Sequence, residues 1–191
     1  MSKRTKASTH RRGDVLRAVV DDANTRRDGV LPMELPGVAE TFRDELDLVA
    51  ALQLRWHTRL AGHIERALMD EPMELESSVL TAWRNAATEL VGVRMILDAY
   101  TAHPTSEEMD NALRTAARKD WSMLAAMAGK AAVNDEGAPA VGRALEEQAR
   151  TLYRPTLSEP RHRAEPTPSR ADTLRTQIGG RLTKLKAHLA A

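Results

Sequence analysis

Three tryptophans and one histidine are the residues whose types and spacing most suggest a binding site. Trp56, Trp83 and Trp121 each lie on a separate long segment with helical spacing of apolar residues. Counting along antiparallel helices from the turns between these segments places the three indoles at nearly the same height, with His63 on the same face as Trp56. Such a layer could form a pocket for a flat ligand, or it could fill the core of a helical bundle. We favour the core interpretation and keep the ligand pocket as an alternative.

The histidines form no recognised metal or catalytic motif. His57 and His63 are six residues apart, so they point to different sides of a helix and cannot form the i, i+4 pair of zinc hydrolases. We expect His63 to contact Glu74 or Ser77 across the turn that follows it. The one Glu-x-x-His, Glu159–His162, lies in a proline-rich stretch, whereas a di-iron bundle needs this motif on two helices. The sequence therefore predicts no metal, no cofactor and no catalytic residue, and it favours an interaction protein over an enzyme.

The elements that carry these residues are helices. Thr105 opens one of them in a Thr-x-x-Glu capping box, and strand signals are absent. We predict an all-α protein, an antiparallel bundle of three long helices plus a shorter fourth, with a short N-terminal helix near residues 14–27. The segments with apolar residues at spacings of three and four are 38–67, 75–100, 109–128 and 139–153.

Charge divides this chain of net charge +1 into an acidic middle and two basic ends. Residues 1–13 carry a net charge of +5, residues 14–153 carry −9, and residues 154–191 carry +5. Four prolines between 154 and 170 are typical of an extended linker. We therefore expect a basic disordered arm over 1–13, a helical bundle over 14–153, a Pro-rich flexible linker over 154–170, and a basic amphipathic helix over 171–191.

The C-terminal segment carries the interaction signal. Its leucines recur with helical spacing and basic residues lie around them, which is typical of an amphipathic helix. Gly179 and Gly180 in its middle cost about 2 kcal/mol relative to alanines, so this helix needs a surface to be stable. We predict that it docks on a protein partner or on its own bundle, and the pattern leaves both possibilities open. The expected contact residues are Leu174, Ile178, Leu182, Leu185, Leu189, Arg175, Arg181, Lys184 and Lys186.

Two other functions stay open at this point. A nucleic-acid-associated accessory protein would contact phosphates through its basic ends, and small-ligand binding or catalysis in the bundle core is the second alternative. A membrane surface is disfavoured because the apolar face of the last segment lacks Phe and Trp. We expect a cytoplasmic protein, since the sequence has no cysteine, no signal-peptide pattern and no apolar run of about 20 residues. The N-terminal residues proposed to contact nucleic acid are Lys3, Arg4, Lys6, Arg11 and Arg12.

Overall fold

Every regular element in the described part of the chain is an α-helix, which confirms the predicted fold class. The structure, a computed structural model, describes residues 2–132 and 134–153. The predicted linker and C-terminal helix lie outside the described residues. None of the described helices is both long and apolar enough to span a membrane. The helices are α1 (Ser2–Arg26), α2 (Val38–Thr41), α3 (Glu45–Asp70), α4 (Leu75–Glu89), α5 (Val91–Ala102), α6 (Glu107–Met127) and α7 (Ala138–Leu152).

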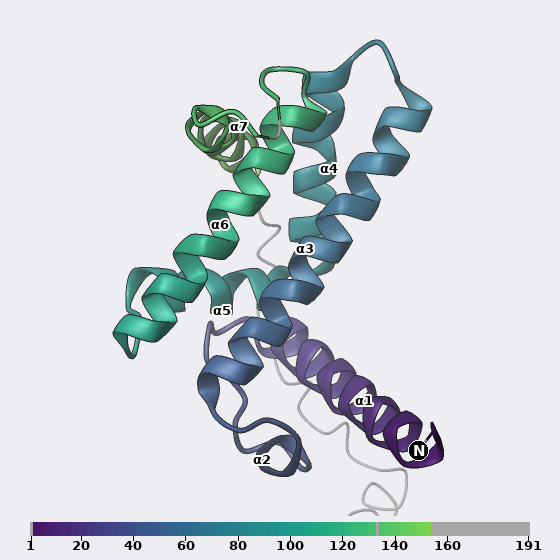
Figure 1. Ribbon diagram of the computed structural model, residues 1–191, viewed down its shortest axis with the longest axis vertical. Coiled ribbons are helices and arrows are strands. Elements are labelled where there is room, and N and C mark those ends of the chain that lie inside the picture. Colours follow the sequence, from purple (N-terminus) through teal and green to yellow (C-terminus); the bar gives the residue numbers. More distant parts are fainter. Residues whose placement is uncertain (1, 133, 154–191) are drawn as a thin grey trace, which may run out of the picture. The chain divides into compact units, whose positions relative to one another are not determined.

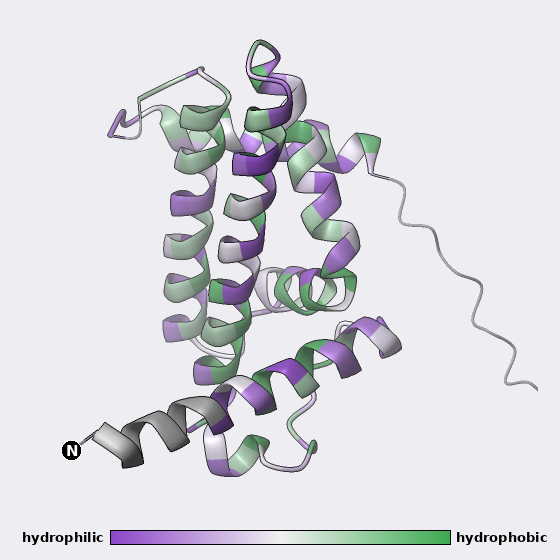
Figure 2. Cartoon of the chain, turned by 90° about the vertical axis from the view of Figure 1, so that its right-hand side faces the viewer, coloured by the Kyte–Doolittle hydropathy of each residue, from purple (hydrophilic) through white to green (hydrophobic). Residues whose placement is uncertain are grey.

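The helices pack in pairs around one apolar core. Helix α3 packs on α4, and α6 packs on α7, while α1 crosses one end of α3 and packs on α5 (Figure 1). Figure 2 shows that the coloured helices carry both hydrophobic and hydrophilic residues, as expected where one face of a helix is buried and the other is exposed. Each of the seven helices contributes at least one buried apolar side chain to the core.

Helix α1 begins at Ser2, whereas the sequence predicted a disordered arm over 1–13 and a helix only from residue 14. Arg12 gives the physical reason, because it ties the arm to the rest of the protein. Its guanidinium donates to the Asp47 carboxylate at 2.9 Å and to the Thr41 carbonyl at 3.1 Å. It also lies 4.4 Å from the centre of the Phe42 ring. Extending a helix that is already nucleated costs little, so the helical order continues into the arm.

The predicted helix over 38–67 is two helices, α2 and α3. The backbone at Phe42 is extended, and Asp44 starts α3 as its N-cap residue. The Asp44 carboxylate accepts a hydrogen bond from the Asp47 amide at 2.8 Å, which satisfies one of the free donors of the first turn. Apolar spacing hid this break, because Phe42 is buried even though it lies outside both helices.

The predicted helix over 75–100 is also divided, into α4 and α5. The side chain of Asn24 in α1 inserts at the break. Its Oδ1 accepts from the Gly92 amide at 2.9 Å, and its Nδ2 donates to the Glu89 carbonyl at 3.0 Å. These backbone groups would pair within an unbroken helix, and a side chain inserted in the ladder is a known cause of a kink. Gly92 is needed here, since an added Cβ would lie 1.9 Å from the carbonyl oxygen of Ala23.

Helices α6 and α7 lie close to their predicted positions, with one difference at the start of α6. Ser106, not Thr105, is the N-cap residue, and its hydroxyl accepts from the Met109 amide at 3.1 Å. The backbones of α6 and α7 approach closely at Gly142, where an added Cβ would lie 1.8 Å from the Trp121 carbonyl oxygen. Helix α7 packs on both α6 and α4, and Gly142 allows the close approach to α6.

Candidate functional site: a groove between two helices

The structure brings together two of the three tryptophans predicted to form a layer. Trp56 and Trp83 pack edge to face with ring centroids 5.8 Å apart, and Tyr153, not Trp121, packs on Trp83 at 6.0 Å. Both indoles are 2 % exposed or less, which is typical of core side chains. Trp121 lies apart from them and is half-buried, and its ring N–H donates to Glu146 of α7 at 2.6 Å.

His63 contacts Glu89, so the predicted contact with Glu74 or Ser77 is wrong. Its Nε2 lies 2.9 Å from one oxygen of the Glu89 carboxylate, and Arg59 forms an ion pair with the other oxygen at 2.9 Å. Helical side chains lean toward the N-terminus of their own helix. In the antiparallel pair of α3 and α4, the side chains of His63 and Glu89 therefore lean toward each other. We interpret this ion-paired cluster as structural.

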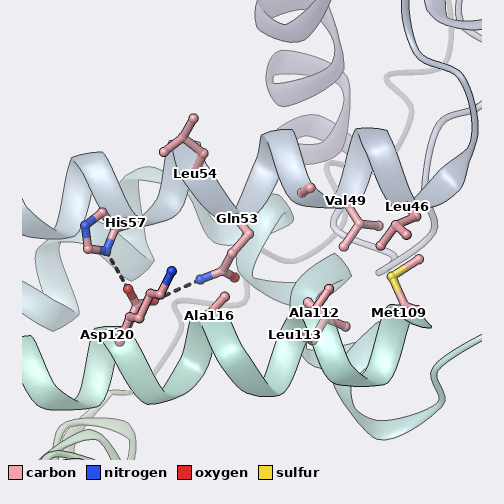
Figure 3. A pocket seen from close by; sticks show the side chains of 12 residues that line it. Leu46, Val49, Gln53, Leu54, His57, Met109, Ala112, Leu113, Ala116 and Asp120 are labelled. Atoms are coloured by element: carbon pink, nitrogen blue, oxygen red, sulfur yellow. Dashed lines mark hydrogen bonds and ion pairs between the residues drawn. The ribbon is translucent and has the colours of Figure 1, made fainter. Parts of the chain in front are cut away.

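A groove between α3 and α6, which sequence reasoning missed, is a candidate site (Figure 3). Its volume is about 360 Å³, at the lower end of the range of ligand pockets. One end of the groove is apolar, and its polar side chains gather at the other end. The apolar part is formed by Leu46, Val49 and Ala50 of α3 and by Met109, Ala112 and Leu113 of α6.

The polar end of the groove is built on Asp120, which is only 6 % exposed. Its carboxylate accepts from Gln53 Nε2 at 2.9 Å and lies 2.5 Å from His57 Nδ1 (Figure 3). Burial raises the pKa of Asp120, and the hydrogen bond from His57 and the charge of Arg94 only partly oppose this shift. Both carboxylate oxygens are engaged, so Asp120 orients the imidazole and offers little free acceptor capacity to the groove.

The signal that could have revealed Asp120 is its place on the apolar face of α6. It lies seven residues after Leu113 and four before Leu124, both of which are buried. An acidic residue at such a position must find hydrogen-bond partners inside the protein. The sequence does not reveal that the partner is His57, because the two residues are 63 positions apart.

The groove is suited to binding rather than to nucleophilic catalysis. A carboxylate that orients an imidazole is half of a catalytic triad, but no side chain that lines the groove carries a hydroxyl or a thiol for His57 to activate. Within residues 2–132 and 134–153, no group of three or more His, Asp or Glu side chains is placed to hold a metal ion.

A second polar cluster joins α5 to α7 and is paired internally. Arg150 donates to both oxygens of Asp98, at 2.9 and 3.0 Å, and also pairs with Glu146 at 2.6 Å. Burial would raise the pKa of Asp98, but the hydrogen bonds and charges of Arg150 and Arg94 lower it overall. The Arg150 guanidinium lies 5.0 Å from the Trp83 ring, so the cluster covers the aromatic core.

The predicted partner-binding residues are only partly within the described chain. Arg12 is paired with Asp47 while its side chain is 42 % exposed, and Arg11 is exposed. The side chains of Lys3, Arg4 and Lys6, and the whole of 171–191, lie outside what the structure describes. Comparison with protein-family models, with curated protein sequences and with solved structures finds no match.

Proposed function

We propose that the protein is a non-enzymatic interaction protein whose α3–α6 groove accepts the apolar face of an amphipathic helix from a protein partner. The observation that supports this proposal is the length of the two walls. The groove extends from Leu46 to His57 on α3 and from Met109 to Asp120 on α6. Eleven residues correspond to about 16 Å, or three helical turns. A partner helix of that length would insert anchors at i, i+3 or i+4, and i+7.

The contrast between the floor and the rim of the groove favours a helix over a small ligand. Val49 and Leu113 in the floor are buried, whereas Ala50 and Ala112 in the rim are exposed and Leu54 is 66 % exposed. A small-molecule site encloses most of the surface of its ligand. An open rim instead leaves one side of the occupant in water, as a docked amphipathic helix requires.

The C-terminal segment 171–191 forms the second part of this proposal. Its sequence pattern supports a docking helix that binds a protein partner or its own bundle, which would make the protein an adaptor with two contact elements. We also propose a cytoplasmic location, supported by the absence of cysteine from the sequence.

Affinity purification from the native cell tests both parts. The proteins to compare are the full chain, a chain that lacks residues 170–191, and the variants Ala112→Arg and Ala144→Arg. Ala112→Arg fills the groove without removing a core side chain, and Ala144→Arg makes the same change at an exposed site of α7 outside the groove. We expect one partner to be lost with Ala112→Arg and retained with Ala144→Arg, and to rebind when both proteins are purified.

The outcomes separate the two contact elements. A partner set that is unchanged by Ala112→Arg would contradict the groove, and a set unchanged by the truncation would contradict the role of 171–191. Circular dichroism of each variant checks that a loss of binding does not come from unfolding.

A further inference from the structure

The two ends of the α3–α6 groove differ in the groups that they offer to an occupant. At the polar end the Asp120 carboxylate is covered, because His57 and Gln53 occupy its oxygens and its side chain is 8 % exposed. What reaches the surface is the imidazole of His57, with a 41 % exposed side chain, and the exposed ammonium of Lys119. Arg94 of α5 lies close enough to Asp120 for its charge to act on that carboxyl, but its guanidinium is paired with Asp98.

The charge at this end of the groove therefore favours an anion. His57 Nε2 and Lys119 make no hydrogen bond or ion pair with the described residues. Helix α3 contributes His57 and the neutral Gln53, α6 contributes Lys119 and Asp120, and α5 contributes Arg94. Among these described residues, Lys119 is the exposed cation without an ion pair, because Arg94 is paired with Asp98 at 2.7 Å and the Asp120 carboxylate is engaged by His57 and Gln53.

We infer that the helix accepted by this groove carries an aspartate or glutamate at one end of its apolar face, where the carboxylate binds the Lys119 ammonium beside the His57 ring. This inference rests on the proposed function. The apolar anchors of the same helix then lie over Leu46, Val49 and Met109, about two to three turns away. The polar end fixes the direction of the partner helix. In a reversed helix the carboxylate would lie over apolar side chains, and its desolvation would weaken binding.

A titration of the full-length protein with three synthetic helical peptides tests the inference. The peptides share an alanine-based frame with leucine at i, i+4 and i+7, and they carry glutamate, glutamine or lysine at i+11. Backbone amide NMR shifts detect binding down to roughly millimolar dissociation constants and map it to α3 and α6. We expect the glutamate peptide to bind about ten-fold more tightly than the lysine peptide, with glutamine between them.

A matched pair of variants assigns the preference to Lys119. Lys119→Glu should reverse the order of the glutamate and lysine peptides, whereas Arg118→Glu, the same change of charge sign at an exposed neighbour outside the groove, should leave it unchanged. Equal affinities for the three peptides would overturn the inference but not the proposed function. No shift with any peptide would overturn both. Dodecanoate is the last probe, and its binding in the groove without peptide binding would assign the site to a small amphiphile and contradict both proposals.

Discussion

Asn24 and Gly92, which are 68 residues apart in sequence, are joined at the break between α4 and α5. The Gly92 amide donates to Asn24 Oδ1 at 2.9 Å, and the Asn24 amide group donates to the Glu89 carbonyl. The break is therefore held by a contact with α1. The glycine at position 92 permits the close approach of the two backbones that this contact requires.

Replacing Gly92 should destabilise the protein strongly. The Cβ of Gly92→Ala would meet the backbone of Ala23 at 1.9 Å, so α1 must move away and the Asn24 bonds must lengthen. We expect a loss of about 3 kcal/mol in the free energy of unfolding, measured by urea denaturation. The control is Gly62→Ala in the middle of α3, where an added Cβ meets no heavy atom within 4 Å and should increase stability by about 0.5–1 kcal/mol. Equal stability of the two variants would show that α1 does not pack at Gly92.

Two buried or partly buried aspartates should respond to pH in opposite directions. The pKa of Asp98 is below its usual value of 3.8 in the folded protein, so its contribution to stability is present above that pH and is lost on acidification. The pKa of Asp120 is raised above 3.8, so ionisation of its carboxyl costs stability as the pH rises. The free energy of unfolding of Asp98→Asn and Asp120→Asn, compared with the parent protein at pH 3 and pH 5, separates these effects.

The direction of each expected change in stability follows from the two pKa shifts. Asp98→Asn should be less stable than the parent at pH 5, by about 1 kcal/mol for this partly exposed pair, with a smaller deficit at pH 3. The free energy of unfolding of Asp120→Asn, relative to that of the parent, should increase when the pH is raised from 3 to 5. Parallel curves for the two variants would contradict the assigned environments.

Arg12 should contribute to stability, although it belongs to a segment that the sequence marks as a basic arm. Arg12→Ala removes the pair with Asp47, the bond to Thr41 and the contact with the Phe42 ring. We expect a loss of about 1 kcal/mol, measured by thermal denaturation at low and high salt. Arg11→Ala, at the exposed neighbouring position, should change stability by less than about 0.5 kcal/mol. An equal effect of the two substitutions would mean that the arm acts only through its net charge.

Apolar spacing predicted the presence and most of the extent of the helices, because each helix buries one face. It missed the break at Leu90 since Leu90, Val93 and Leu97 keep the helical spacing across it and all three are buried. The cause of the break is Asn24, whose position depends on tertiary packing. The start of α3 at Asp44 could have been predicted from the sequence. Aspartate is a preferred N-cap residue, and its side chain accepts a hydrogen bond from the amide three residues later, here that of Asp47.

The site was less accessible than the fold. Counting residues from the turns treats helices as straight and parallel, and it therefore placed Trp121 with Trp56 and Trp83. In the structure Trp121 faces α7, where Glu146 accepts from its ring N–H. The two walls of the groove belong to α3 and α6, which are separated in the sequence by α4 and α5. The sequence of one wall therefore does not indicate which segment forms the other. Among the residues of the site, only Asp120 could be recognised from its neighbours in the sequence, because it is an acidic residue on the apolar face of its helix.

The separation of the indoles has a spectroscopic consequence. Trp56 and Trp83 form a rigid, dry pair, so they should couple as excitons in the near-ultraviolet circular dichroism spectrum. Trp121, whose ring N–H is held by a carboxylate on another helix, should dominate the polarity-sensitive part of the emission. Since the chain contains three tryptophans in total, the loosening of α7 and the melting of the interior can be recorded as separate optical signals from one unlabelled sample.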